Sequence, residues 1–163
     1  MEAKNPWPES ELGEHAYIKG RIGWRGLKAS EYANDGPFLI AGNHLKNGKV
    51  NWSDCDHISE YRYNESWEIA LQEGDIILSK DGTIGRVAIV DYLPGPATIN
   101  STMMLVRVSQ PLQPRFIYHY LNSTPFQKLV EEKVSGSSIP HIFQRDMVRL
   151  RICLPSETEQ RRI

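Results

Sequence analysis

Cations and a tryptophan are spaced by glycines between Lys19 and Lys28, and these residue types suit contact with nucleic acid. Glycines at positions 20, 23 and 26 disfavour a regular helix, because each costs about 1 kcal/mol relative to alanine. A guanidinium can bind a guanine edge or a phosphate through two parallel hydrogen bonds, and an indole can pack on sugars or bases. The segment therefore predicts an adaptable contact surface. The alternative is a flexible surface loop with Trp24 packed in the core.

Three further polar segments carry hydrogen-bond donors, at residues 43–49, 79–86 and 135–141. Asn47-Gly48 and Asp81-Gly82 favour tight turns, since glycine accepts the positive φ that such turns require. Turn chemistry alone is an equally good account of the second of these pairs. The sequence leaves open whether residues 79–86 contact a ligand or only reverse the chain.

Charge is divided between two neighbouring segments, although the net charge is only −1. Residues 19–49 contain six basic and two acidic residues, a balance of +4, whereas residues 54–75 contain seven acids and one arginine, a balance of −6. The small net charge argues against a protein that coats nucleic acid non-specifically, but one surface could attract phosphates. The alternative is two solvated loops of opposite sign.

The motifs of common catalytic sites are absent from the sequence. Residues 81–85 lack the Gly-Lys-Ser/Thr ending of a phosphate-binding loop, and neither Gly-x-Ser-x-Gly, His-Glu-x-x-His nor a paired-cysteine motif occurs. Asp54-Cys55-Asp56-His57 has no zinc-ligand spacing and is better interpreted as a turn-rich loop. We therefore expect no catalysis and no bound metal or cofactor in this chain.

The elements that must position these loops are mostly short strands. The length of 163 residues and 40% hydrophobic content indicate one globular domain, with no apolar run near the roughly 20 residues that span a bilayer. Two cysteines and the lack of a signal peptide favour a reducing cytoplasm. The apolar runs predict a central buried β-hairpin and several flanking strands, at 76–78 with 87–90, and at 12–19, 38–41, 50–52, 103–108 and 148–154.

Helices are expected near the C-terminal end. Pro114 should start a helix over 115–121, and a capping box at Thr124 should start a second over 125–133. Ser156 and Glu159 signal a third helix start only a few residues before Ile163, which suggests an excised fragment or a natural truncation before a long helix. The expected class is α+β: a β-rich domain of twisted short strands and hairpins with two short helices and the start of a longer one.

The stretch Gly74-Asp-Ile-Ile-Leu-Ser-Lys-Asp-Gly-Thr-Ile-Gly-Arg-Val-Ala88 resembles the central motif of specificity subunits of type I restriction–modification enzymes. Other landmarks follow in that family's order: Pro37-Phe-Leu39 with Gly42-Asn43, Thr98-Ile-Asn100, residues 116–123, Gly136-Ser-Ser-Ile-Pro-His141, and Leu154-Pro-Ser-Glu-Thr-Glu-Gln-Arg-Arg-Ile163. Ser101 departs from the glutamine that many members carry there. The resemblance spans nearly the whole chain.

The resemblance implies a target recognition domain at residues 1–154, followed at 155–163 by the start of a conserved spacer helix. Such a domain recognises one half of a bipartite site in double-stranded DNA. Methyltransferase subunits, using S-adenosylmethionine, then modify adenine, and restriction subunits, using ATP and Mg²⁺, translocate and cleave, all in the cytoplasm of a bacterium or archaeon and away from any membrane. Alternatives are a non-catalytic β-rich protein-interaction module and the recognition domain of a fused restriction–methylation enzyme.

Donor side chains on the polar loops are the expected DNA contacts, because recognition needs base-edge donors on a rigid scaffold and cations on phosphates. The candidates are Arg21, Trp24, Arg25, Lys28, Lys46, Lys80 and Arg86, together with Asn43, Thr83, Ser137 and His141.

Overall fold

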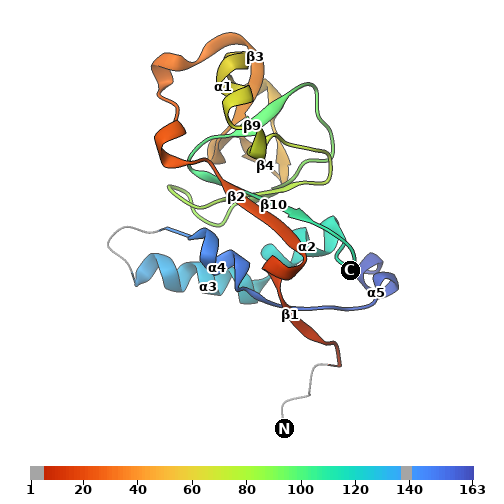
Figure 1. Ribbon diagram of the computed structural model, residues 1–163. Coiled ribbons are helices and arrows are strands. Elements are labelled where there is room, and N and C mark those ends of the chain that lie inside the picture. Colours follow the sequence, from red (N-terminus) through yellow and green to blue (C-terminus); the bar gives the residue numbers. More distant parts are fainter. Residues whose placement is uncertain (1–5, 137–140) are drawn as a thin grey trace.

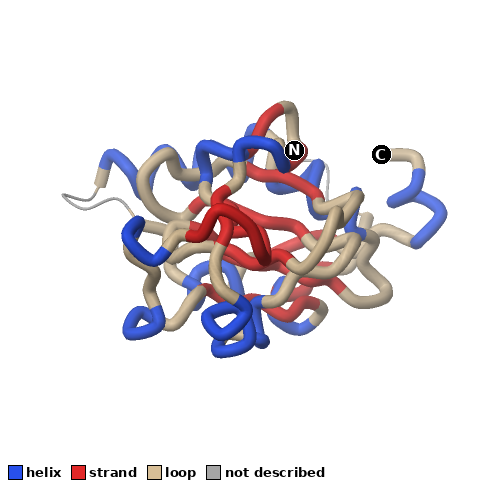
Figure 2. The backbone as a smooth tube through the Cα atoms, turned by 90° about the horizontal axis from the view of Figure 1, so that it is seen from above, coloured by secondary structure: helices blue, strands red, loops and turns tan. Residues whose placement is uncertain are grey.

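A four-stranded antiparallel sheet forms the middle of the molecule in the computed structural model, which describes residues 6–136 and 141–163 (Figure 1). Its strand order is β2-β10-β7-β8, with bounds Ala16–Gly20, Met103–Val108, Ile76–Ser79 and Val87–Ile89. The predicted hairpin and the predicted strand at 103–108 are confirmed. Seen from above, strands occupy the middle and helices lie around them (Figure 2).

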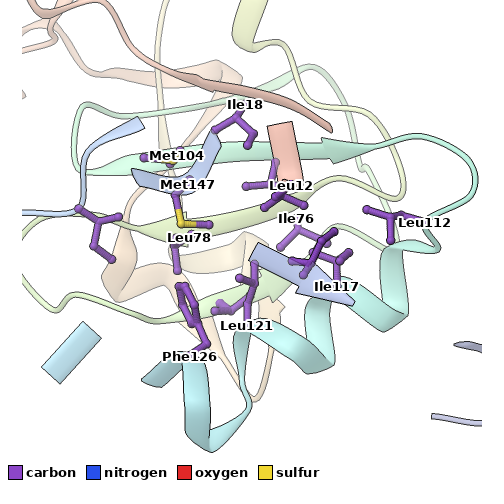
Figure 3. Close-up of a cluster of buried hydrophobic side chains, with 14 of the residues drawn as sticks. Leu12, Ile18, Ile76, Leu78, Met104, Leu112, Ile117, Leu121, Phe126 and Met147 are labelled. Atoms are coloured by element: carbon purple, nitrogen blue, oxygen red, sulfur yellow. The ribbon is translucent and has the colours of Figure 1, made fainter. Parts of the chain in front are cut away.

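Both faces of this sheet are buried, and its side chains divide between two hydrophobic clusters. Ile76 and Leu78 face the C-terminal helices, where Ile117, Leu121 and other apolar residues pack on them (Figure 3). Ile77 lies on the other face, in the second cluster. Successive strand residues point to opposite faces, so an uninterrupted apolar run is what a strand covered on both sides requires.

The second cluster is covered by a three-stranded sheet of order β6-β3-β9, with bounds Asp56–His57, Ala33–Ile40 and Ala97–Ile99. β3 and β9 are parallel, whereas β3 and β6 are antiparallel. A small hairpin of β4 (Leu45–Lys46) and β5 (Lys49–Val50) turns at Asn47 and Gly48, whose φ angles are 52° and 75°. Helix α1 (Glu60–Glu65) lies beside this sheet (Figure 1).

The other face of the central sheet is covered by helices α2 (Pro114–Leu121) and α3 (Thr124–Ser135), by α4 (Gln144–Val148), and by the antiparallel pair β1 (Glu9–Glu11) and β11 (Arg151–Cys153). Helix α5 (Glu157–Arg161) begins at the expected cap, where Ser156 Oγ accepts the Glu159 amide across 3.3 Å. The described residues also contain six 3₁₀ turns, at Leu12–Glu14, Gly23–Arg25, Ala29–Glu31, Gly42–His44, Trp52–Asp54 and Trp67–Ile69.

Several element boundaries differ from the sequence prediction. The strand expected at 12–19 is a 3₁₀ turn at Leu12–Glu14 followed by β2, and β1 lies just before it. Gly13 in this turn packs closely, since a Cβ there would lie 2.5 Å from a Val148 methyl carbon. Ser123 occupies the N-cap of α3 in place of Thr124, and that helix continues to Ser135. The last strand begins at Arg151 because residues 144–148 form α4, which is too short to show helical periodicity.

The mixed α+β class is confirmed by the small sheets and the C-terminal helices. In the ranges 6–136 and 141–163, no helix has the length and apolar character needed to cross a membrane.

Candidate nucleic-acid interface

Ser79, at the end of β7, holds the following loop (residues 80–86, the β7–β8 loop) in one shape. Its buried hydroxyl donates to the Thr83 carbonyl oxygen and accepts the Arg86 amide across 2.9 Å. The Ser79 carbonyl oxygen also accepts the amide of Gly85, whose φ is 89°. The buried Ser79 side chain therefore provides hydrogen-bond partners for two backbone groups inside the loop, whereas the side chains of Thr83 and Arg86 are exposed.

Two neighbouring segments hold the near end of this loop through the backbone of Lys80. The Lys80 amide donates to Thr102 across 2.9 Å, and the Lys80 carbonyl accepts the Ile142 amide across 3.0 Å. Beside it, the Asp81 carboxylate pairs with the imidazole of His141 and lies 3.7 Å from Lys80 Nζ. The segment that begins at His141 is thus fixed against the β7–β8 loop.

The far end of the loop contacts the 3₁₀ turn that carries Asn43. Arg86 Nη1 donates to the Gly42 carbonyl across 3.4 Å, and Asn43 is exposed next to it. On the other side, Gln127 Nε2 of α3 donates to the Gly85 carbonyl across 3.1 Å. The sheet, the turn and the helix therefore all hold this loop. The β7–β8 loop and the segments that contact it bring together predicted DNA contacts from distant parts of the sequence, namely Asn43, Lys80, Thr83, Arg86 and His141.

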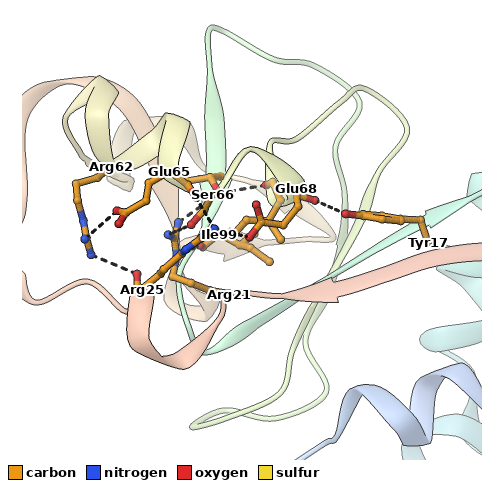
Figure 4. Close-up of polar contacts among 10 residues, drawn as sticks. Tyr17, Arg21, Arg25, Arg62, Glu65, Ser66, Glu68 and Ile99 are labelled. Atoms are coloured by element: carbon orange, nitrogen blue, oxygen red, sulfur yellow. Dashed lines mark hydrogen bonds and ion pairs between the residues drawn. The ribbon is translucent and has the colours of Figure 1, made fainter.

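Arg21 does not belong to this group. Its guanidinium is buried, with Nε donating to the Ile99 carbonyl across 3.0 Å and Nη1 to Ser66 Oγ across 3.1 Å (Figure 4). Burial is the main cause that lowers the pKa of Arg21 to about 10, which still leaves it charged at neutral pH. Arg21 therefore joins the two sheets from the inside, and only 5% of its surface is exposed.

Arg25 is held by the end of α1 and the turn after it. Its Nη1 donates to the Glu65 carbonyl across 2.6 Å and lies 3.3 Å from the Glu68 carboxylate (Figure 4). Lys28 is exposed, and its backbone amide donates to the Glu31 carboxylate across 2.8 Å. Of these two cations, Lys28 presents the more accessible side chain.

The two charged segments partly neutralise one another. Lys46 Nζ lies 3.0 Å from the Asp54 carboxylate, and Arg25 pairs with Glu68. Arg62, the single cation of the acidic segment, donates to the carbonyl oxygen of Gly26 across 2.9 Å. The sequence blocks of opposite sign therefore do not form two separate surfaces. The positive charge that remains exposed is concentrated at fewer positions than the sequence suggested.

Two predicted contacts fall outside what the structure describes: the side chain of Trp24 and residue Ser137. Across residues 6–136 and 141–163, no cluster of three or more His, Cys, Asp or Glu side chains is placed to hold a metal ion. Burial raises the pKa of the Cys55 thiol to about 12, so this cysteine is an inert core residue.

Residues next to the β7–β8 loop that the sequence analysis did not select include Phe143. Phe143 is 45% exposed. Its ring contacts the His141 ring, at 4.5 Å between centroids, and the Arg145 guanidinium, whose Cζ lies 4.6 Å from the ring centroid. The adjacent Ile142 is buried. No local sequence pattern indicates that Phe143 is the exposed member of this apolar pair, because that depends on how the chain packs around Ile142.

Comparisons with known proteins identify the family. A family model described as "Type I restriction modification DNA specificity domain" matches residues 5–163. The chain is 23% identical over 140 residues to the type I restriction enzyme MjaVIII specificity subunit of Methanocaldococcus jannaschii, covering 83% of this chain and 33% of that protein.

Two solved structures have a similar fold. The HsdS subunit from Thermoanaerobacter tengcongensis gives a TM-score of 0.69 at 18% identity, covering 99% of this chain and 37% of that chain. A chain from a study of assembly and conformational transition of the type I R-M system gives a TM-score of 0.72 at 19% identity. That match covers 99% of this chain and 37% of the other chain. This chain thus spans about a third of the length of these relatives. Because the family model matches nearly all of its residues, the chain belongs to the type I restriction–modification DNA specificity domains.

Proposed function

We propose that this chain binds double-stranded DNA and recognises one half of a bipartite target as part of a specificity subunit. The specificity subunit is a non-catalytic component of the type I system. In this proposal, methyltransferase subunits that use S-adenosylmethionine modify adenine in the target. Restriction subunits that use ATP and Mg²⁺ join through the methyltransferase core and cleave the DNA. The assembly acts in the cytoplasm, where the genome is accessible to it.

The observation that carries the proposal is the grouping of donor side chains around the β7–β8 loop. Lys80 and Arg86 supply cations, whereas Asn43 and Thr83 supply uncharged donors of the kind that contact base edges. The buried Ser79 hydroxyl fixes the loop backbone, so less conformational entropy is lost when DNA binds. A rigid scaffold with mixed cationic and amide donors supports sequence recognition better than non-specific attraction.

The domain boundary is part of the same proposal, with residues 1–154 as the recognition domain and 155–163 as the start of a spacer helix. Gln160 of α5 is buried, and its Nε2 donates to the Pro111 carbonyl across 2.8 Å. Its Oε1 accepts the Gln113 amide across 2.8 Å. One side chain thus fixes the direction in which a longer helix would leave the domain.

The test measures DNA affinity as salt is raised from about 50 to about 200 mM, with this chain assembled with its methyltransferase subunits. Methylome sequencing of cells that carry the system first supplies the target. We expect affinity to fall steeply with salt, and Arg86→Ala to weaken binding by roughly 5- to 150-fold if it contacts a base. If Arg86 contacts a phosphate, the log–log salt slope should instead fall by about one.

The matched control is Arg151→Ala, because Arg151 is an exposed arginine on β11 whose side chain pairs with Glu9. Among the strands that the structure describes, β11 pairs with β1 in a separate two-stranded sheet and makes no backbone pairing with the central sheet. Equal losses in the two variants would contradict the assignment of the β7–β8 loop. An assembly with no DNA affinity at about 50 mM salt would reject the proposed function and favour a protein-interaction module.

A further inference from the structure

Ile22 and Phe143 form an exposed apolar pair beside the proposed DNA contacts. Ile22 is 40% exposed and Phe143 is 45% exposed. Both line one surface pocket of about 300 Å³, whose other walls include Lys80, His141 and Gln144. Ile22 immediately precedes the turn Gly23–Arg25 and Phe143 immediately precedes α4, so two separate segments of the chain place apolar side chains at the same point.

Phe143 is held in its exposed position. Its amide donates to the Asp146 carboxylate across 3.2 Å, which fixes the backbone at the start of α4. Its ring contacts both the His141 ring and the Arg145 guanidinium, and both contacts favour this orientation. An aromatic ring that is held at the surface has lost little conformational freedom before it meets a ligand, which makes it an efficient contact residue.

The groups around this pair are suited to DNA. The exposed Arg145 and Lys80 place positive charge near the pocket. The Asp81 carboxylate pairs with His141 and lies 3.7 Å from Lys80 Nζ, so it offsets part of this charge. Gln144 is exposed at the same pocket and carries the amide that pairs with the N6 and N7 edge of adenine. In the major groove the apolar group available for contact is the 5-methyl group of thymine.

We propose that the Ile22–Phe143 pocket recognises an A·T base pair in the target half-site, with the thymine methyl group against the Phe143 ring and Ile22. This inference rests on the proposed DNA-binding function and adds a base preference to it. The cations beside the pocket favour this occupant over an apolar protein segment, because they complement the phosphates that flank the base pair.

The experiment replaces each thymine of the half-site in turn with deoxyuridine, which removes only the 5-methyl group. Binding is measured with the full chain in its methyltransferase assembly, as wild type and as Phe143→Ala. For wild type we expect one or two of these replacements to weaken binding by about fourfold, the effect of burying one methyl group. In Phe143→Ala the unmodified duplex should bind more weakly, and the same replacements should have no further effect.

Tyr92→Ala is the matched control, since Tyr92 is a 60% exposed aromatic residue in the loop after β8, at the opposite end of the hairpin from residues 80–86. It should retain the wild-type response to every deoxyuridine. Ile22→Ala provides a second test at the same pocket should Phe143→Ala reduce thermal stability. Its response to deoxyuridine should be diminished at the same positions.

The inference is overturned if wild type and Phe143→Ala respond equally to deoxyuridine at every position. That result, obtained with an assembly that binds the unmodified duplex in a salt-dependent way, leaves the proposed function standing. Failure of the wild-type assembly to bind any duplex would overturn both.

Discussion

The Nε atom of Arg21 lies 3.0 Å from the carbonyl oxygen of Ile99, and this hydrogen bond joins the end of β2 in the central sheet to β9 in the three-stranded sheet. The same guanidinium donates to Ser66 Oγ across 3.1 Å and approaches Thr98 Oγ1 at 3.4 Å. Three acceptors from two segments therefore surround one buried cation. The loop that follows Arg21 is anchored by this arrangement rather than by apolar contacts alone.

Arg21→Ala should lower the free energy of unfolding by about 2–4 kcal/mol, because it leaves buried acceptors without their charged donor. Chemical denaturation measures this change directly. Lys28→Ala, which removes an exposed cation from the same loop, should change stability by less than about 0.5 kcal/mol. A stability of Arg21→Ala equal to that of Lys28→Ala would show that the buried hydrogen bonds contribute little.

Ile77→Ala should cost about 2–5 kcal/mol of stability, since the residue is fully buried between the central sheet and its covering strands. At a temperature where the variant remains folded, its DNA affinity should match wild type. The measurement pairs thermal unfolding with a binding titration. A loss of affinity without loss of stability would contradict the assignment of this strand to the scaffold.

Arg25→Ala should reduce both stability and DNA affinity. The hydrogen bonds from its guanidinium to the carbonyl of Glu65 and the carboxylate of Glu68 are partly buried. We therefore expect the free energy of unfolding to decrease by about 1–2 kcal/mol. The exposed Lys28 is the comparison, because Lys28→Ala should affect affinity alone. Equal melting temperatures of Arg25→Ala and wild type would show that the hydrogen bonds of Arg25 do not contribute to stability.

The parts of the fold that local patterns specify were predictable from the sequence. The apolar runs on either side of Asp81-Gly82 indicate a buried hairpin, and Asn47-Gly48 indicates the smaller one. Pro114 marks the first residue of α2, and Ser156 is the cap of α5. Each of these signals depends on residues close together in the sequence, so it does not require knowledge of the tertiary contacts.

The roles of individual cations were not predictable in the same way. Arg21 finds Ser66 and Ile99 at sequence separations of 45 and 78 residues, and no local pattern reports such partners. The pairing of Lys46 with Asp54 and of Arg25 with Glu68 likewise depends on how distant segments meet. The exposure of Phe143 could not be predicted for the same reason, because it depends on the burial of its neighbour Ile142, whose amide bonds to Lys80 in the β7–β8 loop.

The stability of the domain should fall between pH 7 and pH 5 because of His44. Burial is the main cause that lowers the pKa of His44, and the Ala41 amide donates to its Nδ1 across 2.9 Å, which requires an unprotonated nitrogen there. As pH falls below about 6.5, the unfolded chain takes up a proton at this residue while the folded chain resists it. The unfolded state then binds more protons, so the free energy of unfolding decreases until the pH passes the lowered pKa of the folded state.

Denaturation of wild type and His44→Gln at several pH values between 5 and 7.5 measures this effect as a difference in slope. The free energy of unfolding of His44→Gln at neutral pH differs from that of wild type. As pH falls it should decrease less than in wild type, because the variant lacks the imidazole that takes up the proton. His119→Gln, which removes an exposed histidine from α2, is the control for loss of an imidazole. Parallel profiles for wild type and His44→Gln would contradict the assignment, since a neutral buried ring must make folding depend on pH in this interval.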